Sequence, residues 1–173
     1  RKLIITDSVF SMEGDIAPLD KLVELKKKYD ATILIDEAHA TGIIGNKGRG
    51  VADFYNVTKE IDVIMGTFSK AFGSIGAFIC SEKKIIKLLK VAVRAYVFST
   101  ALPPPDLAVS REAIKILNEN QSLGKQLLES SEKLRGMFNQ IGFSTMNSQT
   151  QIVPIIIENN LKALEFQSEL KKR

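Results

Sequence analysis

The chain has 173 residues, of which 45% are hydrophobic and 25% are charged, and its formal net charge is +4. This length and composition suit one globular domain, or one domain and part of another, with a sizeable core. The lysines that dominate the charge lack the neighbouring aromatic or glycine-rich residues of an RNA-binding segment, so we expect no nucleic-acid partner. No apolar run is long enough to cross a membrane and no signal-peptide pattern occurs, so we expect no membrane partner.

The single cysteine, Cys80, cannot form an intrachain disulfide, which suits a reducing compartment such as the cytoplasm. It lies in the apolar run Ala77–Cys80, so we expect a buried thiol. The chain begins at Arg1 and ends at Arg173 inside a helical pattern. We therefore expect it to be part of a longer protein.

In the first half of the chain, short apolar runs alternate with helical patterns. Leu3–Thr6 has the composition of a buried strand, and a polar loop follows it. Pro18 suits the first turn of a helix, in which apolar residues recur at helical spacing up to Tyr29. Thr32–Asp36 is the second expected strand, and four glycines between positions 42 and 50 predict a long ordered loop with special backbone angles.

The second half continues this alternation, which predicts an α/β sheet. We expect Ser81 to cap a helix that runs to Val93, and Tyr96–Thr100 to be extended. The last strand follows a long helical interval, so we assign it to a second domain. The expected strands are 62–66, 76–80 and 152–157, and the expected helices are 106–118, 122–140 and 160 onward.

Chemically capable side chains follow two neighbouring strands, at the point where each strand ends. Asp36 and His39 stand just past one strand, and Lys70 stands just past the next. Because ligands bind beyond the carboxyl ends of the strands in an open parallel sheet, we expect these groups to face one crevice. A carboxylate, an imidazole and an amine there could hold an aldehyde cofactor as a Schiff base, and the hydroxyls of Thr67 and Ser69 could hold a phosphate.

These residues also have simpler interpretations. Lys70 could be a surface lysine, Asp36 a helix cap or a salt-bridge partner, and His39, the only histidine, a structural residue. Residues 36–39 also spell the DEAH box of helicases. Such an enzyme needs a Gly-x-x-x-x-Gly-Lys-Ser/Thr loop upstream and a Ser-Ala-Thr motif downstream, and the chain has neither. A DEAH-type helicase fragment is therefore a remote alternative.

Six segments carry a family resemblance that covers nearly the whole chain. They are Val9–Leu19, Asp36–Gly42, Gly48–Gly50, Gly66–Gly73, Phe98–Pro104 and Ile152–Ile156. In this order they resemble the α-oxoamine synthases, fold-type I enzymes that use pyridoxal 5'-phosphate (PLP). The resemblance implies a decarboxylative condensation of an amino acid with an acyl thioester, either an acyl-CoA or an acyl carrier protein.

The resemblance implies a role for each candidate residue around the cofactor ring. Lys70 would hold PLP covalently and move protons at the substrate α-carbon. Asp36 would pair with the pyridinium nitrogen, and His39 and Ser11 would hydrogen-bond around the phenolic oxygen. Lys70, Asp36 and His39 are thus the implied catalytic residues, and no metal is expected.

For the cofactor phosphate, the resemblance implies a contact with Thr67, with Ser69 as a weaker candidate. Ser99 and Thr100 match a loop that, in this family, reaches the phosphate of the neighbouring subunit. A homodimer with active sites at the subunit interface is therefore implied.

The implied fold is α/β, with a mostly parallel sheet in a large domain and a smaller α+β C-terminal domain. Residues 1–120 would be the C-terminal part of the large PLP-binding domain, and 121–173 the linking helix and the start of the small domain. The ring-stacking residue and the glycine-rich phosphate turn would lie upstream of Arg1. The arginine that binds the substrate carboxylate would lie beyond Arg173.

Within the family, Thr67–Ala77 is most similar to the member that joins L-alanine to pimeloyl-CoA or pimeloyl-ACP in biotin synthesis. Members that act on glycine or serine stay open as alternatives. A non-catalytic subunit is a further alternative, and the presence of Lys70, Asp36 and His39 argues against it.

Overall fold

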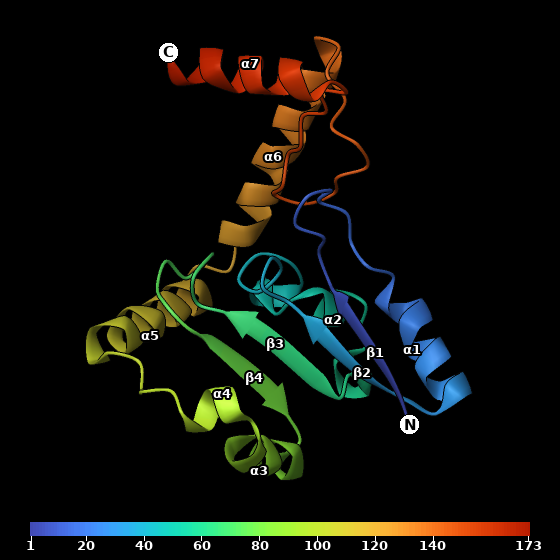
Figure 1. Ribbon diagram of the computed structural model, residues 1–173, viewed down its shortest axis with the longest axis vertical. Coiled ribbons are helices and arrows are strands. Elements are labelled where there is room, and N and C mark those ends of the chain that lie inside the picture. The colour runs from blue at the N-terminus through green and yellow to red at the C-terminus, as the bar shows by residue number, and fades with distance from the viewer.

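One four-stranded sheet lies at the centre of the computed structural model, which describes residues 1–173 (Figure 1). The first three strands are parallel, and the fourth pairs antiparallel with the third. The predicted α/β fold with a mostly parallel sheet is therefore confirmed. In spatial order the strands are β1 (Lys2–Asp7), β2 (Ala31–Asp36), β3 (Val63–Thr67) and β4 (Ala77–Ser81).

The connection from β1 to β2 passes through α1 (Leu19–Tyr29), which buries Leu19 and Val23 and carries three lysines in its last turn. Asp62, just before β3, fixes this helix in place. Its carboxylate oxygen Oδ2 accepts a hydrogen bond from the Ile33 N–H (2.8 Å) and lies 2.8 Å from Lys26 Nζ. The two contacts join α1 to the middle of the sheet. The predicted helix up to Tyr29 is confirmed.

After β2 the chain forms the glycine-rich loop, residues 42–50. Its four glycines all have positive φ angles, between 69° and 102°, so the predicted ordered loop with special backbone angles is confirmed. Gly48 packs against the backbone of Gly42, with no room for a Cβ atom between them, so the loop closes on itself. The short helices of this region are η1 (Asn46–Gly48), α2 (Val51–Phe54) and η2 (Thr58–Glu60).

The hydrophobic core lies on one face of β2, where the side chains of Ile33 and Ile35 are fully buried. Leu19 of α1, Val51 of α2 and Val9 from the loop after β1 pack into the same cluster. The core therefore lies directly beneath the carboxyl end of β2. Burial of this kind stabilises each large aliphatic side chain by about 1.5–3 kcal/mol.

Both edge strands leave apolar side chains exposed. Leu3 and Ile5 of β1 are 58% and 66% exposed, and Cys80 of β4 is exposed as well. The predictions of a buried first strand and a buried cysteine are therefore wrong. Both errors have one physical cause: an apolar run is buried only where other elements cover it, and an edge strand has fewer neighbours.

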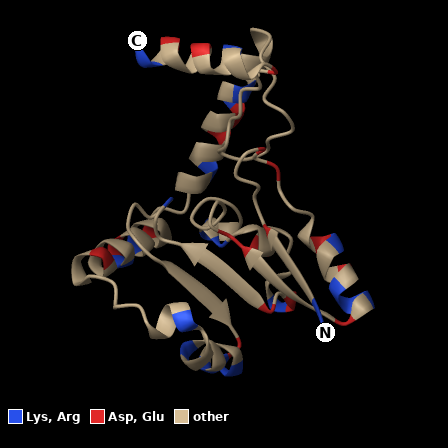
Figure 2. Ribbon diagram, in the orientation of Figure 1, with Lys and Arg blue, Asp and Glu red and all other residues tan.

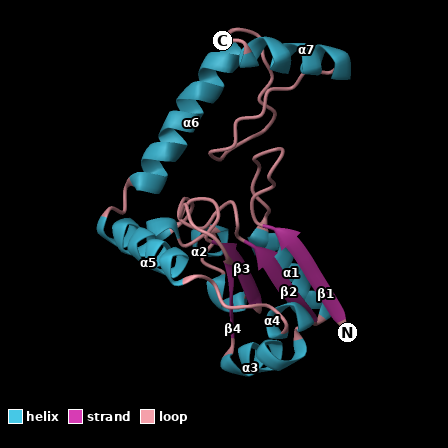
Figure 3. Cartoon of the chain, turned by 60° about the vertical axis from the view of Figure 1, so that its left-hand side comes forward, coloured by secondary structure: helices cyan, strands magenta, loops and turns pink.

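Five helices follow β4. Helix α6 leads away from the sheet, and α7 lies across its far end (Figures 1 and 3). Figure 2 marks basic residues along α1 and α3, in keeping with solvated helix faces. None of the helices combines the length and hydrophobicity that crossing a membrane requires. The five are α3 (Lys83–Ala92), α4 (Arg94–Val97), α5 (Pro104–Glu119), α6 (Leu123–Gln140) and α7 (Asn160–Lys171).

Three local predictions in this half are wrong. A helical turn, α4, covers the first two residues of the segment 96–100 that we expected to be extended, and no strand follows it. The Ser81 hydroxyl donates to the Asp62 carbonyl instead of capping α3. Residues 152–157 form no strand, because no other strand of the chain lies beside them to pair with. The predicted domain boundary at residue 120 falls in the turn between α5 and α6, and the division into two domains stays a prediction.

Candidate active site

Two polar turns meet at the carboxyl ends of β2 and β3. β2 ends at Asp36 and β3 ends shortly before Lys70, and because the two strands are parallel, both ends lie at the same edge of the sheet. The N–H of Glu37 donates to the carbonyl of Met65 (2.8 Å), which holds the turn after β2 against β3. His39 lies in the turn after β2, and Lys70 lies in the turn after β3.

The electrostatics of His39 show that the charges of the two turns act on one another. Burial of the imidazole lowers the pKa of His39 below its ordinary value of 6.5, and the positive charge of Lys70 lowers it further. The carboxylates of Asp36 and Asp7 act in the opposite direction without cancelling the effect. The ring is therefore neutral at neutral pH, and it can donate one hydrogen bond and accept another.

Asp36 is half-buried and uses one of its two carboxylate oxygens inside the protein. Oδ1 accepts a hydrogen bond from the Ala38 N–H (2.7 Å), which orders the turn. The bond closes a turn and not a helix, so Asp36 is neither the helix cap nor the salt-bridge partner of the simpler interpretation. It leaves Oδ2 without a hydrogen-bond or ion-pair partner, so the residue retains a free acceptor at the end of β2.

Lys70 lies in a tight turn that two aromatic side chains anchor. Phe72 is buried, and its ring meets that of Phe68 edge to face, with 5.5 Å between the ring centres. The N–H of Gly73 closes the turn on the Lys70 carbonyl (3.0 Å). The Lys70 side chain is exposed, and its amine has neither a hydrogen-bond nor an ion-pair partner. The backbone is thus fixed while the amine is free to react.

Glu37 is a buried residue of the turn after β2 that the sequence analysis did not single out. It is only 1% exposed, yet its carboxylate has three donors. The Ser8 hydroxyl (2.7 Å) and the Val51 N–H (3.0 Å) donate to Oε2, and the Ala52 N–H (2.9 Å) donates to Oε1. Gly50 lies so close to this carboxylate that a Cβ there would be 2.7 Å from it. Glu37 therefore joins the ends of β1 and β2 to the start of α2.

Thr67 and Ser69 form a small hydroxyl pair at the end of β3. Their oxygens lie 2.8 Å apart, and Thr67 Oγ1 also donates to the Gly76 carbonyl (3.0 Å) and accepts from the Ser69 N–H (3.2 Å). Thr67 is buried, whereas Ser69 is exposed. The Ser69 hydroxyl is thus the more accessible of the two to a ligand.

The other predicted hydroxyls lie on separate connections. Ser11 is exposed in the loop that follows β1, the neighbour of β2. Ser99 and Thr100 are exposed between α4 and α5, where the Ser99 hydroxyl donates to the backbone of α4. None of the three donates a hydrogen bond to Asp36 or His39, so the structure joins only the two turns into one cluster.

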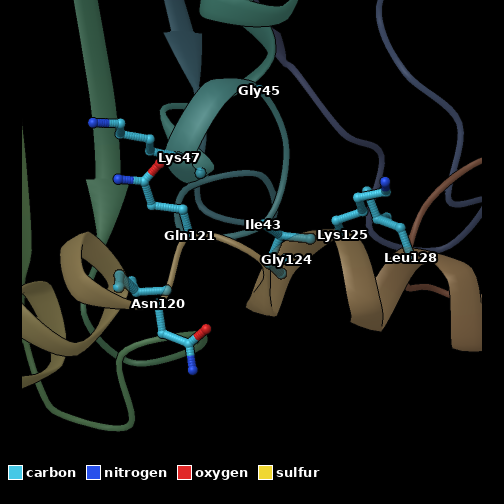
Figure 4. A pocket seen from close by; sticks show the side chains of 11 residues that line it. Ile43, Gly45, Lys47, Asn120, Gln121, Gly124, Lys125 and Leu128 are labelled. Atoms are coloured by element: carbon cyan, nitrogen blue, oxygen red, sulfur yellow. The ribbon is translucent and has the colours of Figure 1, made fainter.

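A cavity of about 130 Å³ lies between the glycine-rich loop and the α5–α6 turn (Figure 4). Figure 4 shows the amide of Gln121 turned toward Lys47, and Lys125 turned away from both. Helix α6 approaches the loop so closely that Gly124 has no room for a Cβ beside the Ile43 carbonyl. The cavity contains none of the predicted site residues, and we regard it as the junction of α6 with the loop.

The comparison with known proteins identifies the family to which the chain belongs. The whole chain, residues 1–173, matches the aminotransferase class I and II family and belongs to it. The 8-amino-7-oxononanoate synthases of Petrotoga mobilis and Thermoanaerobacter pseudethanolicus are 46% and 44% identical to it over 170 and 169 residues. Each alignment covers 98% of this chain and 43% of the relative. The chain thus spans less than half the length of these curated relatives.

Solved structures of two related kinds of enzyme have a fold similar to that of the chain. Serine palmitoyltransferase from Sphingomonas wittichii has a TM-score of 0.88 and 35% identity, over 94% of this chain and 41% of that chain. A structure of SPT with a PLP internal aldimine gives the same values. The 8-amino-7-oxononanoate synthase of Francisella tularensis has a TM-score of 0.84 and 26% identity, over 99% of this chain and 51% of that chain. The fold is that of the fold-type I PLP transferases, and the resemblance to the α-oxoamine synthases is confirmed.

We predict that Glu37→Ala lowers the free energy of unfolding by about 3 kcal/mol, because it leaves a buried hydroxyl and two buried N–H groups without their charged acceptor. Urea unfolding measures the change. Glu37→Gln keeps an acceptor and should lose less. Glu24→Ala, an exposed position in α1, is the control and should stay within about 0.5 kcal/mol of the unaltered protein. Equal losses for Glu37→Ala and Glu24→Ala would contradict the role of Glu37.

A second prediction concerns the titration of His39, followed by NMR of its ring. Its pKa should lie below 6.5, rise toward that value in Lys70→Met, and fall further in Asp36→Asn, since these charges act in opposite directions. Because the unfolded chain binds the proton more tightly, His39 should leave stability unchanged above pH 6.5 and lower it as the pH falls below that value. A His39 pKa that does not respond to either substitution would show that the turns are not coupled.

Proposed function

We propose that the protein is an enzyme that uses PLP and that Lys70 binds this cofactor covalently. The observation that carries the proposal is the unpartnered amine of Lys70 at the same sheet edge as the Asp36 carboxylate and the His39 imidazole. The family relationship supports it, since solved structures of similar fold hold PLP. A non-catalytic subunit would not need all three groups.

The residues at the sheet edge fit this cofactor. PLP, when bound, supplies an electron-withdrawing ring that stabilises negative charge at the substrate α-carbon. The free Oδ2 of Asp36 can keep the ring nitrogen protonated. The neutral imidazole of His39, with Ser11, can hydrogen-bond around the phenolic oxygen. The exposed amine of Lys70 would hold the cofactor covalently and, as a free amine, would move the proton at the substrate α-carbon.

We place the cofactor phosphate beside the hydroxyl pair of Thr67 and Ser69. The pair is next to Lys70 in the chain, and Ser69 is exposed. Ser99 and Thr100 lie on an exposed connection, which supports the proposal that they serve the active site of a second subunit in a homodimer. The free cysteine suits the cytoplasm as the site of action.

The reaction that we propose is the condensation of L-alanine with pimeloyl-CoA or pimeloyl-ACP. The amino acid loses its carboxyl group as carbon dioxide, the acyl carbon joins its α-carbon, and the thiol of the carrier leaves, which gives 8-amino-7-oxononanoate for biotin synthesis. The names of the curated relatives at 44–46% identity support this choice of substrates.

Serine palmitoyltransferase is the second candidate activity. The Sphingomonas wittichii structure of that name has a TM-score of 0.88, against 0.84 for the 8-amino-7-oxononanoate synthase of Francisella tularensis. Glycine C-acetyltransferase and 5-aminolevulinate synthase remain alternatives of the same chemistry. Sequence identity to the curated relatives favours 8-amino-7-oxononanoate synthase activity, whereas the TM-scores favour serine palmitoyltransferase activity. The substrates must therefore be measured.

We predict that the full-length protein shows a visible absorption band when PLP is added, and that Lys70→Ala abolishes both the band and at least about 99% of the condensation activity, because no other group holds the cofactor and moves the proton. Lys47→Ala, an exposed lysine in the glycine-rich loop, is the control and should retain both. Absence of the absorption band from the unaltered protein with added PLP would contradict the proposal.

The substrates are tested by carbon dioxide release from alanine, glycine and serine, each offered with pimeloyl, acetyl, succinyl and palmitoyl thioesters. We predict at least about a tenfold preference for alanine with the pimeloyl donor, the discrimination that a shaped pocket gives for small changes in a substrate. Preference for serine with the palmitoyl donor would assign the second candidate activity instead.

A further inference from the structure

The connection between α6 and α7 returns to the sheet and touches both loops of the candidate site. We call residues 148–152 the strap. Figures 1 and 3 both show this part of the chain descending from the far end of α6 toward the loop above β1. The strap is thus a segment of the second half of the chain that reaches both the loop after β1 and the turn after β2.

The strap is firmly attached to the loop that follows β1. The Gly14 carbonyl accepts hydrogen bonds from the Gln149 N–H (3.0 Å) and the Thr150 hydroxyl (2.9 Å). Thr150 is fully buried, and Arg135 of α6 donates to its carbonyl. Gly14 has a φ angle of +75° and lies too close to Ser148 for a Cβ atom, so this attachment requires a glycine. The backbone of the strap therefore has a fixed position above the site.

From this position Gln151 reaches the turn that carries His39. Its side-chain Nε2 donates to the backbone carbonyl of His39 at 2.7 Å, across 112 residues of sequence. The other end of the amide, Oε1, is buried without a hydrogen-bond partner. An apolar side chain of similar size would fill the space without leaving a buried acceptor unsatisfied. The amide is thus explained by its bond to His39 and not by packing.

We propose that Gln151 is a positioning residue that holds the peptide of His39, and through it the imidazole ring, beside Asp36 and Lys70. The inference deepens the proposed function, because a ring held in this place is what the cofactor would meet. It does not require Gln151 to touch the cofactor or the substrate.

Loss of Gln151 should leave the turn itself folded. The N–H groups of Ala40 and Thr41 donate to the Glu37 carbonyl (2.9 and 2.8 Å), and the Ala38 N–H donates to Asp36. These bonds persist without the strap. The expected consequence is therefore local freedom of His39, with little change in global stability, since Gln151→Leu removes an unsatisfied oxygen together with the hydrogen bond.

The test uses the full-length protein with two substitutions of Gln151, one control substitution, and a fourth that assigns the His39 signal. Gln151→Leu removes the amide, and Gln151→Glu keeps its size but places an acceptor against the His39 carbonyl. Gln149→Leu is the matched control, because Gln149 is exposed and its side chain makes no hydrogen bond. The readouts without cofactor are the hydrogen exchange of the amides of residues 38–41 and the ring NMR signal of His39, assigned by its loss in His39→Gln.

Both Gln151 variants should exchange these amides about tenfold faster and shift the His39 ring signal, while the urea midpoint of Gln151→Leu stays close to that of the unaltered protein. They should also bind PLP about tenfold more weakly, and Gln149→Leu should match the unaltered protein throughout. An unchanged ring signal and unchanged exchange would overturn the inference, as would equal effects of Gln149→Leu. If the unaltered protein binds no PLP, the proposed function fails, and the cofactor-free readouts still decide the role of Gln151.

Discussion

A buried carboxylate, that of Glu37, is the constraint on which the rest of the site depends. A charge in this position is costly unless it is paired or hydrogen-bonded, and here one hydroxyl and two backbone N–H groups stabilise it. The three donors come from the end of β1 and the start of α2. By satisfying them, Glu37 fixes the chain around it, in which Asp36 precedes it and His39 follows two residues later, both at the sheet edge.

Each remaining piece of the site also has a local anchor of its own. The turn of Lys70 is anchored locally by Phe68 and Phe72. It meets the turn of His39 because β2 and β3 are parallel neighbours. In our proposal, a third piece, the strap, holds the His39 turn from above. Reactive groups that are themselves mobile or unpartnered, such as the Lys70 amine, can be presented accurately only on a backbone held in this way.

The sequence predicted those features that local patterns encode. Strand ends at Asp36 and near Lys70, the special glycine angles and most helices follow from apolar runs, turn residues and spacing, and the motifs were sufficient to indicate the family. Contacts between distant segments carry no such signal, which is why the bond from Gln151 to His39 was missed. The predicted burial of Cys80 and of the first strand was wrong, and so was the predicted strand over 152–157. Burial and strand pairing both depend on neighbouring elements that a local pattern does not show.

The central claim is that one lysine at this sheet edge binds the cofactor. The most direct measurement is to add PLP to the full-length protein, make the lysine–cofactor bond permanent with borohydride, and locate the label by peptide mass spectrometry. We predict one pyridoxyl group per chain, on the peptide that contains Lys70. A label on other lysines such as Lys47, with Lys70 unmodified, would contradict the claim.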